Sequence, residues 1–136
     1  ERAGDVRYVL RDYPLETECN DNVPQSIHPA ACEAAVAVRL ARTHNREDQM
    51  VEWIFANQPS LTPEFVKQGA RDVGQVTDFD AKYASTLESV KSDIAVGKAL
   101  GVSATPTFFI NGTKIDGALS PQYFQQAIEY ELKKAK

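Results

Sequence analysis

The sequence predicts an α/β fold in which several helices lie between a first strand and a C-terminal strand–turn–strand–helix unit. Three observations support this fold class. Residues 5–11 alternate and are rich in Val, Tyr and Leu, as a strand is. Residues 30–100 repeat apolar side chains at helical spacing. Residues 102–117 contain an apolar run, an Asn-Gly pair and a second short run, which is the pattern of a hairpin with a type I′ turn.

The first two helices follow a polar loop at residues 16–29. Residues 30–44 are apolar almost all round and rich in strong helix formers, so they predict a largely buried helix. The next segment, REDQMVEWIFANQ, places Met50, Trp53 and Ile54 on one stripe of a second helix.

Capping residues predict where the later helices begin. A Thr-Pro pair at 62–63 starts a helix that runs to about residue 73. Asp78 begins a short helical stretch, and the capping box Ser-Thr-Leu-Glu at 85–88 opens another helix. A Ser-Pro pair at 120–121 starts the final helix.

The composition limits the class of protein. A chain of 136 residues is expected to form one domain. Its formal charge of −4 argues against nucleic acid as a partner, because a phosphate-binding face needs clustered Lys and Arg. No apolar stretch approaches the roughly 18 residues of a membrane-spanning helix. No phosphate-binding loop, Ser/His/Asp set or cofactor motif is recognisable.

The two cysteines, Cys19 and Cys32, leave three readings open. A structural disulfide would tie the polar loop to the buried helix, and such bonds persist in oxidising compartments. A redox-active pair is the second reading, since Cys32 lies near a helix start with His28 four residues before it. Unpaired thiols or a metal site are the third, although the spacings of the two cysteines with His28 and His44 match no compact zinc pattern. No metal site is therefore expected.

Thr105-Pro106 stands at the head of the first hairpin strand. Proline cannot donate to a sheet ladder, and at the first residue of a strand no donor is needed. From these residues alone, a trans bond at an ordinary strand start is the expectation.

Larger segments resemble a known family. The run from Gly101-Val102 through TPTFFING (residues 105–112) to Gly117-Ala118 resembles the C-terminal half of the thioredoxin fold, and is most similar to its disulfide-oxidoreductase (DsbA-like) branch. The segments VRYVLRDYPL, HPAACEAAVAVRLA and 46–100 resemble a strand, the first inserted helix and the helical insertion of the same branch.

The resemblance implies a single thioredoxin-like domain over residues 1–136, with a helical insertion at about 30–100. It also implies that the N-terminal βα unit is missing, because the chain contains no Cys-x-x-Cys and the first strand and active-site helix of the family have no counterpart. The abrupt start at Glu1 fits an excised piece. In this family Pro106 would be cis, and Thr105 would bind an extended substrate through its backbone.

Without the missing central strand, residues 5–11 and 106–111 would each expose an unpaired edge. We expect these edges to be covered in one of three ways. A swapped or neighbouring chain could pair with them, as in a homodimer with strand exchange; the two strands could pair directly with each other; or an upstream segment could fill the gap.

The function that the resemblance implies is that of a thiol–disulfide oxidoreductase domain without cofactor, acting on protein or peptide thiols and disulfides. The expected location is extracytoplasmic, periplasmic or secreted, and such domains also occur fused to membrane quinone-linked oxidoreductases of the vitamin K epoxide reductase type. For lack of Cys-x-x-Cys, little or no dithiol activity is expected of this chain alone. The main alternative is a non-catalytic module that binds extended peptide at the Pro106 edge. A third reading is an enzyme whose redox pair has moved to Cys19 and Cys32.

Overall fold

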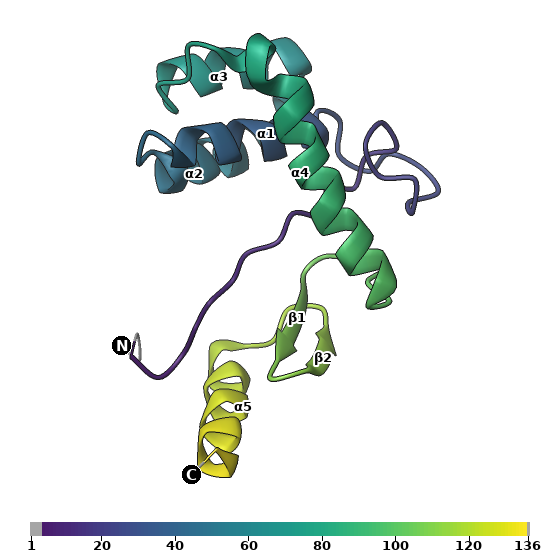
Figure 1. Ribbon diagram of the computed structural model, residues 1–136, viewed down its shortest axis with the longest axis vertical. Helices are drawn as coiled ribbons and strands as arrows, with labels where there is room; N and C mark the ends of the chain where they lie inside the picture. The colour runs from purple at the N-terminus through teal and green to yellow at the C-terminus, as the bar shows by residue number, and fades with distance from the viewer. Residues whose placement is uncertain (1–3, 136) are drawn as a thin grey trace. The chain divides into compact units, whose positions relative to one another are not determined.

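The structure, a computed structural model, describes residues 4–135 of the chain. The chain divides into two compact units, one made of residues 11–100 and the other of the residues before and after that stretch. The described part contains five α-helices and two strands, which are labelled in Figure 1. None of these helices combines the length and the apolar character that crossing a bilayer requires.

Residues 11–100 begin with a loop, continue in helices from Ala31 and contain the apolar core. Helix α1 contacts α2, α3 and α4 and is therefore the centre of this unit. The fully buried side chains of Val36, Met50, Val66 and Val90 lie in that core. The helices of the unit are α1 (Ala31–Arg42), α2 (Glu47–Asn57), the 3₁₀ turn η1 (Gln58–Ser60), α3 (Pro63–Asp72) and α4 (Phe79–Ala99).

Helix α3 begins where its capping residues predict. Thr62 is the N-cap, and its Oγ1 accepts the backbone N–H of Phe65 at 3.1 Å. Pro63 occupies the first helical position, where a missing N–H has no cost. Farther along, Gly69 lies against the indole of Trp53, and a Cβ added to Gly69 would fall 2.4 Å from a ring carbon. The absence of a side chain at Gly69 therefore allows α2 and α3 to approach closely.

Helix α4 corrects the prediction of two separate helical segments after residue 78. One helix runs from Phe79 to Ala99. Ser85 lies inside it and donates its hydroxyl to the carbonyl of Lys82 at 3.1 Å instead of capping a helix start. The reason is local, because residues 79–96 contain neither Gly nor Pro and nothing interrupts the backbone hydrogen bonds.

The carboxylate of Asp93 connects the start of the helical unit to two of its helices. Asp93 is 5% exposed, and its Oδ1 accepts a hydrogen bond from Arg11 at 2.8 Å. Its Oδ2 accepts from Arg39 at 2.6 Å and from the backbone N–H of Asp12 at 3.0 Å. Arg39 also donates to the carboxylate of Asp12. Since Arg39 belongs to α1 and Asp93 to α4, this network fixes the preceding segment against both helices.

The predicted hairpin is present in the other unit. Strands β1 (Thr107–Ile110) and β2 (Thr113–Asp116) pair antiparallel. Asn111 and Gly112 connect them with φ values of 47° and 87°, as a type I′ turn requires.

Helix α5 (Pro121–Lys134) follows the hairpin and begins after Ser120, at the predicted position. Phe108 of β1 packs edge-on against Phe124 of α5, with ring centres 4.5 Å apart. This aromatic contact joins the hairpin to the helix.

The strand predicted over residues 5–11 is not formed. This segment is irregular, and the side chains of Tyr8 and Leu10 are 73% and 58% exposed. A strand needs a neighbour for its backbone hydrogen bonds, and the two strands of the described residues pair with each other. The expectation of direct pairing between this segment and residues 106–111 is therefore also wrong.

Candidate functional site

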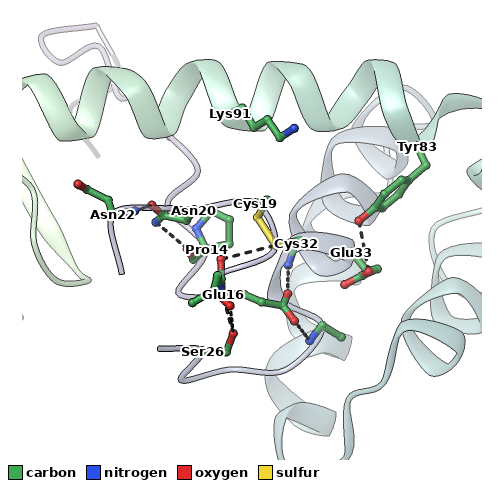
Figure 2. The surroundings of a disulfide bond; sticks show 12 residues. Pro14, Glu16, Cys19, Asn20, Asn22, Ser26, Cys32, Glu33, Tyr83 and Lys91 are labelled. Carbon is green, nitrogen blue, oxygen red and sulfur yellow. Dashed lines mark hydrogen bonds between the residues drawn. A yellow bond between two sulfur atoms is a disulfide. The ribbon is translucent and has the colours of Figure 1, made fainter. Parts of the chain in front are cut away.

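Cys19 and Cys32 form a disulfide, with their Cα atoms 6.0 Å apart. Cys19 is 7% exposed and Cys32 is fully buried. Figure 2 shows the bond joining the loop before α1 to the first turn of that helix. Neither cysteine is a free thiol, and His28 and His44 are exposed. The reading as unpaired thiols or zinc thiolates therefore does not apply to this structure.

Glu16 attaches the same loop to the start of α1. Its Oε1 accepts the N–H of Ala30 at 3.0 Å and its Oε2 accepts the N–H of Cys32 at 2.8 Å. Helix N-termini leave such donors without internal partners, and a carboxylate there also complements the helix dipole. Ala30, the N-cap, has a left-handed backbone with a φ of 59° and is 1% exposed. The disulfide and Glu16 thus fasten one loop to one helical turn.

Glu33 lies beside Cys32 in the first turn of α1 and is 7% exposed. Figure 2 shows its carboxylate facing Tyr83, whose hydroxyl donates to Oε1 at 3.2 Å. The buried Oε2 has no hydrogen-bond partner among the described residues. Burial raises the pKa of Glu33, and the nearby carboxylates of Glu18 and Glu16 raise that pKa further.

Glu16, Glu18 and Glu33 bring three carboxylates together, with one oxygen of each within 4.8 Å of the other two. No sequence motif predicts this cluster, because a loop and a later helix both contribute to it. The visible signal is Glu33, a single acidic residue within the apolar run AACEAAVAV. Carboxylate oxygens are ligands that suit Ca²⁺ or Mg²⁺.

Thr105 and Pro106 are exposed directly before β1, and the peptide bond between them is cis. The Oγ1 of Thr107 donates to the carbonyl of Ala104 at 2.7 Å, which closes a short turn around the two residues. The predicted substrate-binding residues therefore lie on the surface at the start of a strand.

The hydrogen-bond pattern of the hairpin determines which peptide groups remain available. The N–H of Gly117 donates to the carbonyl of Pro106 at 2.9 Å. Hydrogen-bonded pairs alternate along an antiparallel ladder, so the peptide groups of Phe108 face β2. The N–H and C=O groups of Thr107 and Phe109 consequently face the opposite, outer edge of β1.

The two outer edges of the hairpin differ in charge. Lys114 and Asp116 of β2 pair at 3.0 Å, and by the same alternation their peptide groups face the outer edge of β2. Strand β1 reads Thr-Phe-Phe-Ile and has no charged side chain. Charged side chains on an edge discourage pairing with a further strand. The edge of β1 is therefore the one suited to accept a strand, and none occupies it in the described part of the chain.

The structure brings the two cysteines together, while Thr105 and Pro106 belong to the other compact unit. Three features of the described residues could take part in chemistry or binding. They are the buried disulfide, the cluster of three carboxylates, and the backbone donors and acceptors on the outer edge of β1. Sequence reasoning named the first and the last of these, and missed the carboxylates.

Comparison with known proteins gives a family match over almost the whole chain. A family model described as thioredoxin (Thioredoxin_4) matches residues 2–130. Among curated relatives, the Na⁺/H⁺ antiporter NhaA of Herminiimonas arsenicoxydans is 27% identical over 132 residues, covering 93% of this chain and 19% of the relative. The Na⁺/H⁺ antiporter NhaA 1 of Mycolicibacterium gilvum is 28% identical over 132 residues, covering 93% and 20%.

The chain thus spans about a fifth of the length of the curated relatives it matches. No solved structure matches it. The family match, together with helices and a two-stranded sheet, confirms the predicted α/β thioredoxin-like fold. The chain therefore belongs to the thioredoxin family.

Proposed function

We propose that this chain is a thiol–disulfide oxidoreductase domain of the DsbA-like branch, which binds its substrate along the outer edge of β1. The observation that carries this proposal is the uncharged edge with the outward-facing peptide groups of Thr107 and Phe109, preceded by exposed Thr105 and Pro106. An extended peptide can add to such an edge through main-chain hydrogen bonds. Membership of the thioredoxin family supports protein or peptide thiols and disulfides as the substrates.

The reaction needs a thiolate that attacks a substrate disulfide, releases one substrate thiolate and leaves a mixed disulfide. Cys19 and Cys32 are bonded to each other and buried, so they offer no such thiolate in this state. We therefore assign substrate docking to this chain and the nucleophile to a Cys-x-x-Cys pair outside its 136 residues. The chain by itself is expected to have little or no dithiol activity.

An extracytoplasmic location, such as the periplasm, is part of the proposal. The disulfide supports it, because such bonds persist in oxidising compartments. The relatives named as Na⁺/H⁺ antiporters contain the matching region as about a fifth of their length, which supports a module tethered to a membrane protein. A quinone-linked oxidoreductase of the vitamin K epoxide reductase type is the proposed redox partner.

Backbone NMR tests the docking edge. The isotope-labelled chain is titrated with reduced, alkylated insulin B chain, a peptide that comes from a disulfide substrate. The amides of Thr107 and Phe109 should shift and become protected from hydrogen exchange. The amides of Lys114 and Asp116 are the matched controls, since they face the other edge of the same hairpin. Absent shifts on β1, or equal shifts on both edges, would contradict the proposal.

A binding module without redox function is the second candidate, and the buried, bonded state of the two cysteines favours it. Insulin reduction by an active thioredoxin added in trans separates the two. A docking domain of an oxidoreductase should raise the rate, whereas a module that only holds peptide should lower it. Turnover by the chain alone that is abolished by Cys19→Ser would instead identify the Cys19–Cys32 bond as the redox pair.

A further inference from the structure

We propose that Glu16, Glu18 and Glu33 bind a divalent cation that prefers oxygen ligands, Ca²⁺ in the first instance. The carrying observation is the Oε2 atom of Glu33, which is buried and has no hydrogen-bond partner among the described residues. Glu33 belongs to the cluster in which three carboxylate oxygens, one from each residue, lie within 4.8 Å of one another. The docking function proposed above uses none of these residues.

The local structure neutralises only part of the charge of this cluster. Both oxygens of Glu16 accept backbone N–H groups at the start of α1, which partly offsets the charge of that carboxylate. The carboxylate of Glu33 receives neutral hydrogen bonds, from the hydroxyl of Tyr83 and from its own backbone N–H, and no cationic side chain pairs with it. None of the ion pairs in the described residues involves Glu16, Glu18 or Glu33. A buried carboxylate without compensation is costly, and a bound cation would remove that cost.

The spacing of the oxygens fits the proposed ion. Ca²⁺ holds its oxygen ligands at about 2.3–2.6 Å, so two ligands on opposite sides of the ion lie roughly 5 Å apart. Three oxygens within 4.8 Å of one another meet this limit. Mg²⁺ demands a tighter octahedron and gives up its waters reluctantly. Because Glu18 is exposed, water can complete the coordination of Ca²⁺ from the solvent side.

A cation at this place would join the loop that carries Glu16 and Glu18 to helix α1 through Glu33. The disulfide between Cys19 and Cys32 spans the same junction. Cation binding should therefore stabilise the folded chain by an amount set by the ratio of the ion concentration to its Kd.

Terbium luminescence is the first measurement, because Tb³⁺ occupies Ca²⁺ sites and accepts excitation energy from a nearby tyrosine. Tyr83, which donates to Glu33, is that tyrosine. The oxidised full chain should show sensitised emission that Ca²⁺ displaces. Glu33→Gln should weaken binding by about tenfold or more, since ligand charge sets affinity. The matched control is Glu88→Gln, an exposed residue of α4 that pairs with Lys91, and it should bind as the wild type does.

Thermal unfolding in CaCl₂ and in EDTA provides a second readout that needs no fluorophore. Tyr83→Phe should keep the Ca²⁺-dependent rise in Tm while losing sensitised emission. The Tm of Glu33→Gln in EDTA reports whether that variant still folds. The proposal is overturned if the wild-type Tm is the same in CaCl₂ and EDTA, or if Glu33→Gln binds Tb³⁺ as tightly as the wild type. Stronger displacement by Mg²⁺ than by Ca²⁺ would overturn the assignment to calcium.

Discussion

Replacing both cysteines with alanine tests whether the Cys19–Cys32 bond is structural. The bond spans a sequence separation of 13 residues, and the chain-entropy relation gives about 3 kcal/mol for a loop of that size. The backbone hydrogen bonds that Glu16 accepts from Ala30 and Cys32 do not depend on sulfur, so they should survive the change. We therefore expect the double variant to fold, with a free energy of unfolding lower by about 2–4 kcal/mol.

Urea unfolding followed by far-ultraviolet circular dichroism measures this loss. With the usual slopes for small proteins, the midpoint should fall by roughly 1–3 M urea. The reduced wild-type chain should show the same fall, and thiol-tagging reagents should label the oxidised native chain only after strong reduction. A double variant within about 0.5 kcal/mol of the oxidised chain would refute the structural reading. Ready reduction of the native chain by mild reductant would assign the pair to redox chemistry.

Three further predictions concern single positions. Asp93→Ala should lower the free energy of unfolding by about 1–3 kcal/mol, because the half-buried Arg39 and the backbone N–H of Asp12 lose their acceptor. Arg11 is 64% exposed, so Arg11→Ala should cost under about 1 kcal/mol in the same urea assay. Equal losses would contradict the network. Gly69→Ala should destabilise the chain by about 1–3 kcal/mol although alanine is the better helix former, because its Cβ would meet the indole of Trp53. The emission of Trp53, the chain's one tryptophan, should shift, and a more stable variant would disprove the contact. Since burial raises the pKa of Glu33 above its ordinary value of 4.5, the stability that this group contributes is present below pH 4.5 and is lost as the pH rises through the folded pKa. In EDTA, Glu33→Gln should therefore equal or exceed the wild type in stability at neutral pH and show a flatter pH profile; an unchanged profile would argue against the shift.

Features that depend on neighbouring residues could be predicted from the sequence. The turn at Asn111-Gly112 and the helix start at Thr62-Pro63 are determined by local backbone preferences, and both are present. The strand expected at residues 5–11 failed because a strand depends on a partner that is distant in sequence. The helix start predicted from the capping box at residues 85–88 was wrong for another reason. These four residues lie inside a helix that has already begun at Phe79.

The candidate site shows the same division. Two cysteines can be named from the sequence, but their bonding depends on a loop that Glu16 folds back onto α1. The carboxylate cluster depends on the same loop, so neither its members nor the buried oxygen of Glu33 can be inferred from spacing. The sequence shows how many acidic residues the chain contains, whereas only the fold shows which of their carboxylates lie close together.

Ala30 has a consequence for how this sequence can diverge over evolutionary time. Its φ of 59° disfavours β-branched residues, and since Ala30 is 1% exposed, a longer side chain here would have to be accommodated among buried neighbours. Alanine and glycine fit this position without adding a buried side chain. Cys32 and Glu33 lie two and three residues after Ala30, so a substitution that changed this backbone turn would displace the disulfide and the buried carboxylate in a single step.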